Sequence, residues 1–494
     1  MKNLVNFFIL VNLVITGYRG CGLPKEKHKR IYSHLEKKFS LIGGIQAEKI
    51  EATQSPIFTP NDVYNVQFDL SEMTYTSDKD IADSKWLEDI EKTLKSDFLP
   101  KVALYFRNLL KIKRNYPTMY KGVTVDCIDV EFSEMFMNDF QGGLGLLITL
   151  EGTREDSYVA YSYPCEIDQT TNRPVFGVLN FNPYYFDIVN FRDLFDTTIH
   201  EIFHILGFNP VLYSYFVNEE NEKLGRNNVV LQENGKISIK TPKVVEFAKK
   251  HFACDTLESV RLEDDGGDGS QGSHWERSLL MNESMTASEI ANTRVSGFTL
   301  SLMEDTGWYT VNYKLEEFFT FKKGAGCDAV AKEDFNRCEI KGKQGCFYER
   351  DHQSVCYKDF FGGPNLQEIA IAKTYCRDKN MKKSKTFFYE SYGNHSKCFI
   401  GDLKRKWGDK SIITSSGSFC FDAVCEGSQK KLYLKIGEDT YDCSKKENIE
   451  IDTEFLFGTV ECPGYATVCM HYSLCSAECE LTGRCLIEGN CFNF

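Results

Sequence analysis

The pattern of hydrophobic and polar residues predicts a long helix followed by several strands. Residues 84–112 carry apolar side chains at helical spacing, and Pro100 is expected to kink or divide this helix. The expected strands are residues 63–70, 123–132, 143–150, 158–164 and 175–182. A long helix, several strands and a second helix predict an α+β domain in which a twisted sheet packs against long helices.

The second helix carries the candidate chemistry. Its apolar stripe is expected to consist of Phe195, Ile199, Ile202, Phe203 and Leu206, and Gly207 is expected to end it. His200 and His204 are four residues apart, so both imidazoles lie on one face of a helix and can hold one Zn²⁺ ion. Glu201 beside them is placed to take a proton from a metal-bound water. The alternative is two histidines that are merely hydrogen-bonded on a partly buried helix.

A third ligand must come from another part of the chain. Glycine-rich sequence at residues 266–273 delivers His274, whereas the competing His251 lies on a lysine-rich helix over residues 242–252 and is expected to be solvated. Met285 follows His274 by eleven residues and is the candidate methionine turn, an apolar support beneath the histidines. Residues 287–304 are expected to form a further helix.

Length, charge and the N-terminal sequence place the protein in the secretory route. The 494 residues exceed one core, and a net charge of −13 argues against nucleic-acid or anionic-membrane surfaces. Residues 1–20 have the composition of a signal peptide, with an apolar run too short to span a membrane. No other apolar stretch reaches spanning length, and no C-terminal glycolipid signal is evident. We therefore expect a secreted or cell-surface protein without a membrane span in its mature form.

The cysteines predict a disulfide-rich C-terminal region. Fifteen of the nineteen cysteines lie in residues 327–491, and Cys127 and Cys165 are expected to pair earlier in the chain. Tight spacing at residues 461–494 is typical of a small module of the epidermal-growth-factor type, although paired cysteines could instead bind metal. Cys21 lies in a basic segment, residues 21–54, that resembles a pro-segment. It is a candidate cysteine switch, or else is lost with the signal peptide or unpaired.

Three sequence runs carry a family resemblance: residues 200–208, Gly-Ser-His-Trp-Glu at 272–276 and Asp-Thr-Gly-Trp-Tyr at 305–309. From about residue 60 to its end, the chain resembles the leishmanolysin family, the gp63-type or M8 metzincins. A long insertion before the third histidine distinguishes this family from other metzincins. The resemblance implies one catalytic zinc ion held by His200, His204 and His274, with Glu201 as the catalytic residue and Met285 as the Met-turn. It also implies a cysteine-switch pro-region, for which Cys21 is available.

The resemblance further implies a metzincin-type catalytic domain, a central inserted domain and a disulfide-rich C-terminal domain. The expected division begins with a signal peptide (1–20), a pro-segment (21–54) and an N-terminal catalytic part (55–208). A central part with the third histidine (209–325), a cysteine-rich domain (326–460) and an epidermal-growth-factor-like module (461–494) follow.

The expected function is that of a secreted zinc endopeptidase in which Glu201 is general base and acid for a zinc-activated water. Its partners would be protein or peptide substrates, together with cell-surface or extracellular-matrix proteins. Residues 142–150 are the candidate cleft edge for strand addition by the substrate. The alternatives are a non-catalytic zinc-binding adhesion protein that uses its cysteine-rich end, which the intact Glu201 disfavours, and a metal-dependent hydrolase of non-peptide substrates.

Overall fold

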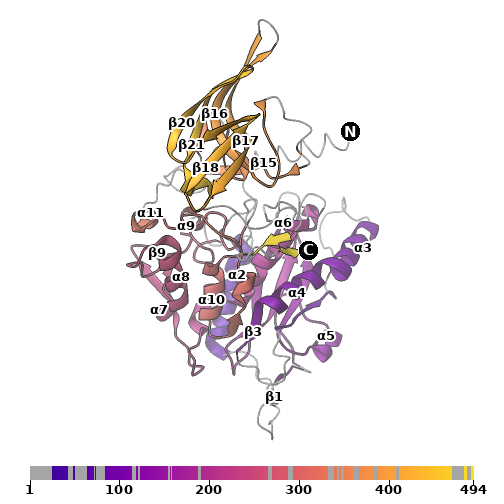
Figure 1. The fold of residues 1–494 in the computed structure, drawn as a ribbon. Coiled ribbons are helices and arrows are strands. Elements are labelled where there is room, and N and C mark those ends of the chain that lie inside the picture. The colour runs from indigo at the N-terminus through magenta and orange to yellow at the C-terminus, as the bar shows by residue number, and fades with distance from the viewer. Residues whose placement is uncertain are drawn as a thin grey trace. The chain divides into compact units, whose positions relative to one another are not determined.

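A computed structural model of the chain forms two compact units, Met1–Glu316 and Glu317–Phe494, which are described separately (Figure 1). The residues that the structure describes are 25–42, 48–49, 64–71, 73, 84–113, 118–120, 123–153, 156, 158–186, 191–264, 270–287, 293–331, 339–341, 344–346, 350–359, 367–379, 381, 388–407, 411–469, 483–486 and 491–493. The expected signal peptide and Cys21 lie outside these residues. The finer division into six segments stays a prediction.

A four-stranded mixed sheet in the order β2-β5-β7-β6 is the centre of the first unit. Strands β2 (Val66–Asp69), β5 (Leu144–Leu150) and β7 (Pro174–Phe181) run parallel, and β6 (Ala160–Ile167) is antiparallel to β7. Every residue of β5, β6 and β7 is buried, because both faces of the sheet are covered.

The sheet order corrects one expectation, because β5 pairs with β2 on one side and β7 on the other. Residues 142–150 therefore do not form the edge of the cleft. Among the described strands, β2 and β6 each have a single neighbour, so they are the two edge strands, and β6 is the one that helix α6 packs on. The apolar pattern of a strand indicates burial but not which strands lie beside it, so the sequence could not distinguish a central strand from an edge strand.

The long helix is interrupted where Pro100 was expected to divide it. Helix α3 (Ser84–Thr93) continues through a π-helical segment, η1 (Leu94–Phe98), into α4 (Leu99–Leu109). Pro100 lies in the first turn of α4, where its missing N–H costs least, and the π segment takes up the irregularity just before it.

Helix α6 (Phe191–Leu206) packs on β6 and β7. Gly177 of β7 permits this approach, because a Cβ there would lie 2.8 Å from the Ile205 side chain and 2.9 Å from the carbonyl oxygen of Tyr163. The neighbouring Phe176 points to the opposite face, where its ring centre is 4.7 Å from that of Phe140. Phe140 directly follows helix α5 (Glu134–Asp139), so α5 and its neighbours cover that face.

Residues 123–132 form no strand, contrary to expectation. Ile128 and Asp129 have φ of 56° and 68°, which breaks the extended backbone. The expected disulfide between Cys127 and Cys165 is present and ties this segment to β6. Tyr163 Oη donates to the Cys127 carbonyl at 2.9 Å, so side-chain contacts replace a strand ladder.

The remaining elements of the first unit are α2 (Lys25–Ile42), β1 (Glu48–Lys49), β3 (Leu110–Ile112), β4 (Thr118–Met119), η2 (Pro183–Tyr185), η3 (Tyr213–Tyr215), α7 (Arg226–Val229), β8 (Val230–Glu233), β9 (Lys236–Ile239), α8 (Pro242–Phe252), β10 (Val260–Arg261), α9 (Arg277–Leu280), α10 (Gly297–Asp305), β11 (Tyr309–Val311) and η4 (Tyr313–Leu315). Helix α8 has the predicted bounds. Of the expected helix over 287–304, residues 288–292 lie outside the described part of the chain, and residues 293–296 are not helical. Helix α10 begins at Gly297, after Ser296 caps it by accepting from the Phe298 N–H at 3.2 Å.

The second unit is built from antiparallel sheets. One has the order β12-β13-β14-β15 and a larger one has the order β19-β18-β17-β16-β21-β20. Its elements are α11 (Cys327–Ala331), β12 (Glu339–Lys341), β13 (Gln344–Cys346), β14 (His352–Asp359), β15 (Gln367–Tyr375), β16 (Ser396–Trp407), β17 (Ser411–Glu426), β18 (Lys431–Ile436), β19 (Asp439–Asp442), β20 (Lys446–Asp452), β21 (Leu456–Pro463), α12 (Tyr465–Cys469), β22 (Gly483–Cys485) and β23 (Cys491–Asn493). Figure 1 shows β16 and β17 as its long central hairpin.

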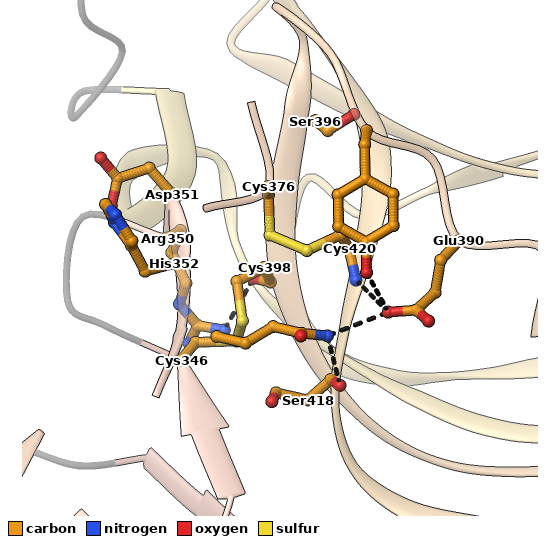
Figure 2. Close-up of a disulfide and its surroundings, with 12 residues drawn as sticks. Cys346, Arg350, Asp351, His352, Cys376, Glu390, Ser396, Cys398, Ser418 and Cys420 are labelled. Carbon is orange, nitrogen blue, oxygen red and sulfur yellow. Dashed lines mark hydrogen bonds and ion pairs between the residues drawn. A yellow bond between two sulfur atoms is a disulfide. The ribbon is translucent and has the colours of Figure 1, made fainter. Parts of the chain in front are cut away.

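Disulfides join these sheets, as the cysteine count predicted. Cys398 and Cys420 face each other across β16 and β17. Cys398 forms a disulfide with Cys346, and Cys420 forms one with Cys376 (Figure 2). Two further bridges stabilise the larger sheet, Cys425–Cys469 and Cys443–Cys462. Most of the expected growth-factor-like module lies outside the described residues. Its Arg484 forms a fully buried ion pair with Glu317 at the start of this unit.

Candidate metal centre and active site

Helix α6 places two of the candidate ligands in the interior of the first unit. The predicted apolar stripe is buried, and Phe203 and Phe195 make edge-on ring contacts with Phe106 and Phe98 of the bent helix, at centroid distances of 5.4 and 6.3 Å. His200 and His204 are 4% and 7% exposed on another face of the helix. The helix ends at Leu206, directly before Gly207, as predicted.

The structure brings His274 to the two helical histidines. Its Nε2 lies 3.2 Å from the Nε2 of His200 and 3.2 Å from that of His204, and the helical pair are 3.0 Å apart. His274 arrives on a turn that is held by a bridge between Leu262 and Trp275. Three imidazole nitrogens from positions up to 74 residues apart thus point at one location.

The other ring nitrogens are fixed by backbone carbonyls. His200 Nδ1 is 2.5 Å from the Ser284 oxygen, His204 Nδ1 is 2.9 Å from the Phe208 oxygen, and His274 Nδ1 is 3.1 Å from the Ser270 oxygen. A carbonyl only accepts, so each Nδ1 carries the proton and each Nε2 presents a lone pair. Histidine ligands of metals are commonly oriented in this way, by a hydrogen bond from the ring nitrogen that does not face the ion.

Burial keeps these imidazoles neutral. Desolvation, reinforced for His200 by the neighbouring His204, lowers the pKa of His200 to about 3, and desolvation lowers the pKa of His204 to about 4. Burial and the two other rings lower the pKa of His274 well below its usual value. Converging lone pairs repel one another unless a cation lies between them. A tetrahedral zinc ion with bonds of about 2.0–2.1 Å holds its nitrogens roughly 3.3–3.4 Å apart, so the residues present fit zinc closely.

Glu201 is buried beside the histidines, at 1% exposure. Ser162 Oγ of the edge strand donates to the Glu201 backbone oxygen at 2.6 Å and fixes this turn of α6 against β6. A buried carboxylate next to two candidate metal ligands and to a sheet edge is a candidate for proton transfer.

Met285 is fully buried in a turn over residues 281–286. Its N–H donates to Glu283 Oε2 at 2.6 Å, and its carbonyl accepts from the Trp275 N–H at 2.9 Å. The neighbouring Ser284 carbonyl is the one that holds His200, so the turn is part of the site through its backbone.

His251 does not belong to the site. It is 5% exposed and lies among aromatic rings, with its ring centre 5.1 Å from that of Phe298 and 5.0 Å from that of Phe252. The expectation that it is solvated is wrong, because the apolar face of α8 packs on α10 and includes it. A lysine-rich helix can still bury a histidine on its inner face.

Helix α2, within the expected pro-segment, contacts the segment that directly follows helix α6. The Tyr32 hydroxyl accepts from Asn209 Nδ2 at 3.0 Å, one residue beyond the carbonyl that holds His204. Burial, with the charge of the nearby Glu201 as a smaller cause, raises the pKa of Tyr32 well above its usual value. Through Tyr32 the helix therefore reaches the residue next to Phe208, whose carbonyl holds His204.

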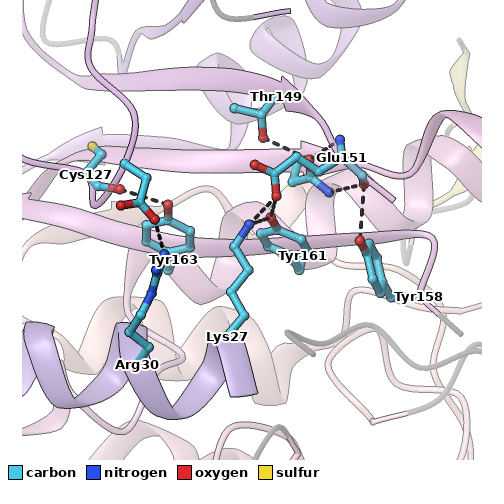
Figure 3. Close-up of polar contacts among 10 residues, drawn as sticks. Lys27, Arg30, Cys127, Thr149, Glu151, Tyr158, Tyr161 and Tyr163 are labelled. Carbon is cyan, nitrogen blue, oxygen red and sulfur yellow. Dashed lines mark hydrogen bonds and ion pairs between the residues drawn. The ribbon is translucent and has the colours of Figure 1, made fainter. Parts of the chain in front are cut away.

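Ion pairs fix the same helix along the sheet edge. Lys27 contacts Glu151 and the hydroxyl of Tyr161 in β6, and Arg30 pairs with Asp129 (Figure 3). Lys38 pairs with the buried Glu166 of β6. Its Nζ also donates to the Cys165 backbone oxygen at 3.2 Å, so α2 occupies polar groups of the edge strand.

Sequence reasoning missed several residues that shape the site. Asn209, Ser270 and Ser284 contribute through their positions in the folded chain, which their residue types alone do not reveal. Glu283 is the residue that the sequence could have indicated. It lies two residues before Met285, so a buried Met-turn would bury its carboxylate as well.

The motif, the three convergent imidazoles and the mixed sheet behind them define a site of the metallopeptidase type. Residues 145–358 match the model of peptidase family M8, leishmanolysin. The resemblance to the leishmanolysin family that was drawn from sequence is confirmed over this region.

Named relatives agree with this assignment. The chain is 27% identical over 428 residues to a leishmanolysin-like peptidase of Drosophila pseudoobscura pseudoobscura, covering 65% of this chain and 62% of the relative. It is 28% identical over 428 residues to a leishmanolysin-like peptidase of Caenorhabditis elegans, covering 65% and 64%. A ciliated left-right organizer metallopeptidase of Mus musculus is 28% identical over 277 residues, covering 51% and 38%. The chain thus spans less than two thirds of the length of these relatives.

Proposed function

We propose that this chain is a zinc-dependent endopeptidase. The observation that carries the proposal is the convergence of three neutral Nε2 atoms, 3.0–3.2 Å apart, beside the buried carboxylate of Glu201. A structural zinc site needs no adjacent carboxylate, and such sites usually have four protein ligands. Three ligands leave a position for a reacting group.

In this proposal, the Nε2 atoms of His200, His204 and His274 hold one zinc ion. When bound, the ion supplies a Lewis acid that activates a water and polarises the scissile carbonyl. Glu201 accepts the proton of that water at a carboxylate oxygen and passes it to the leaving amine nitrogen. The three Nδ1–carbonyl hydrogen bonds hold the imidazoles in the tautomer that this chemistry needs.

We further propose that the peptide substrate binds along β6. An edge strand offers backbone donors and acceptors to an extended peptide, which then adds a strand to the sheet. Ser162 connects β6 directly to the backbone of Glu201, so a peptide on this edge lies close to the catalytic carboxylate.

Residues 21–54 hold the enzyme latent in this proposal. Helix α2 supports it, because Lys38 takes up a carbonyl of β6 and Tyr32 lies near Glu201. A helix in that place competes with a substrate for the same edge. Cys21 as a thiolate ligand of the zinc ion is a separate part of the proposal, and it rests on sequence alone.

Secretion or display at the cell surface fits the disulfides of both units, which form in oxidising compartments. Within the described residues no helix is both long and apolar enough to cross a bilayer. Substrates would be proteins or peptides, and the cysteine-rich unit is the candidate for binding cell-surface or matrix proteins.

A quenched-peptide assay on the purified full chain tests the central proposal. We expect hydrolysis that a chelator abolishes and added Zn²⁺ restores. Glu201→Gln should bind zinc as the wild type does but lose roughly 10²–10⁴-fold in kcat, the range for a missing general base.

The outcomes of this assay distinguish the three candidate functions. Full activity in Glu201→Gln would overturn the mechanism. Zinc binding without hydrolysis of any peptide, in the wild type and in a chain freed of α2, would favour the adhesion protein instead. Hydrolysis of esters but not of peptides would favour the non-peptide hydrolase.

A further inference from the structure

A buried carboxylate outside the metal ligands joins the parts of the site. Glu283 is 0% exposed. Its Oε2 accepts from the Met285 N–H at 2.6 Å, and its Oε1 accepts from Thr299 Oγ1 at 2.6 Å and from Ser296 Oγ at 2.9 Å. The Ser296 N–H donates to the same oxygen at 3.2 Å. Burying a carboxylate costs free energy even when donors surround it, which makes a purely space-filling role a poor explanation for Glu283.

The turn that Glu283 closes contacts His200 and the residue after His274, in both cases through its backbone carbonyls. The Ser284 carbonyl accepts from His200 Nδ1 at 2.5 Å, and the Met285 carbonyl accepts from the N–H of Trp275, which directly follows His274. Backbone carbonyls can serve this way only when the turn has one fixed conformation. The Glu283–Met285 hydrogen bond spans that turn and fixes it.

Thr299 connects the same carboxylate to the third histidine by a second route. Its Oγ1 donates to Glu283 and accepts from Trp275 Nε1 at 3.0 Å. Trp275 is therefore held at its backbone by the Met285 carbonyl and at its indole by Thr299 of α10. Both contacts depend on where Glu283 lies.

We propose that Glu283 is the positioning residue of the metal centre: its carboxylate fixes the 281–286 turn, and that turn sets the His200 ring and places His274. The inference rests on the proposed zinc site. It assigns the methionine turn a second role, because the Met285 backbone, rather than its side chain, carries the connection to the ligands.

Matched variants separate this role from general packing. Thr299→Val keeps the shape but removes the hydroxyl that joins Glu283 to Trp275, whereas Thr299→Ser keeps the hydroxyl. Met285→Leu changes the side chain and keeps the backbone bonds. Glu283→Gln places an amide NH₂ against donors, so at least one hydrogen bond is lost.

The experiment measures Zn²⁺ affinity by chelator competition and records the visible spectrum of the Co²⁺-substituted full chain. Urea unfolding measures the stability of each variant. Glu283→Gln and Thr299→Val should each weaken zinc binding by roughly 10–100-fold, the usual effect of losing a second-shell partner, and should change the cobalt spectrum. Thr299→Ser and Met285→Leu should stay within about threefold of the wild type in zinc affinity, since they keep these hydrogen bonds.

Wild-type affinity and cobalt spectrum in both Glu283→Gln and Thr299→Val would overturn the inference, whatever their stability. If Glu283→Gln does not fold, Thr299→Val against Thr299→Ser decides it. A wild-type chain that binds no zinc would instead overturn the proposed function. A chain that binds zinc but cleaves nothing leaves the positioning test intact.

Discussion

His200 Nδ1 lies 2.5 Å from the carbonyl oxygen of Ser284, a residue 84 positions further along the chain. This hydrogen bond joins the helix that carries two candidate ligands to the turn that supports the third. Because both partners are buried, water cannot replace the contact. The geometry of the candidate metal centre therefore depends on the packing of the whole first unit.

A comparison of two buried histidines tests the ligand assignment. His274→Ala should lower zinc affinity by at least about 10³-fold and abolish peptide hydrolysis, because two imidazoles alone hold zinc weakly. His251→Ala should leave zinc affinity unchanged and lower stability by about 1–3 kcal/mol, since it opens a space among aromatic rings away from the three converging imidazoles. Chelator competition and urea unfolding measure the two effects. Equal zinc affinities in the two variants would refute the assignment.

The latency proposal predicts a gain of activity from weakening α2. In the full chain, Tyr32→Ala combined with Lys27→Ala removes the contacts to Asn209, Glu151 and Tyr161, which are worth about 1–3 kcal/mol together. The initial rate on a quenched peptide should rise roughly 10–100-fold.

The exposed Lys29 provides the control for this experiment. Lys29→Ala removes one charge from the same helix and should leave the initial rate unchanged. An unchanged rate in the double variant would show that α2 does not exclude the substrate.

The pH dependence of stability follows from Glu283. Burial raises the pKa of this carboxyl from 4.5 to about 7. Because the folded-state pKa lies above the unfolded value, the folded chain favours the protonated form, and the associated stability is fully present below pH 4.5 and lost as the pH rises through 7. The loss is about 3 kcal/mol.

Urea unfolding of the metal-free chain between pH 4.5 and 8 measures this loss, with Glu283→Gln as the reference. The unfolding free energy of the wild type should fall relative to that of the variant across this range. A constant difference between the two would contradict the shifted pKa.

The disulfide between Cys127 and Cys165 closes a separation of 38 residues beside the edge strand. Replacing both cysteines by alanine should lower the unfolding free energy by about 3–4 kcal/mol, mainly by freeing the unfolded chain. The peptide KM should rise, because β6 loses an anchor at Cys165. Replacing Cys443 and Cys462 in the second unit is the control, and it should leave KM as in the wild type.

The local elements were determined by the sequence. The spacing of His200 and His204 on an amphipathic helix, the bounds of α8 and the interruption near Pro100 all depend on neighbours within a few residues, where periodicity and backbone sterics decide the outcome.

Tertiary structure alone decided that β6 and not β5 is an edge strand, that 123–132 is not a strand, and that His251 is buried. It also decided which carbonyls orient the histidines. These outcomes depend on contacts between residues far apart in the chain, and the free energy of such contacts depends on the packing of the whole unit. The sequence could name His274 as the third imidazole, but only the folded chain, through the turn at Glu283 to Thr286, places it beside the other two.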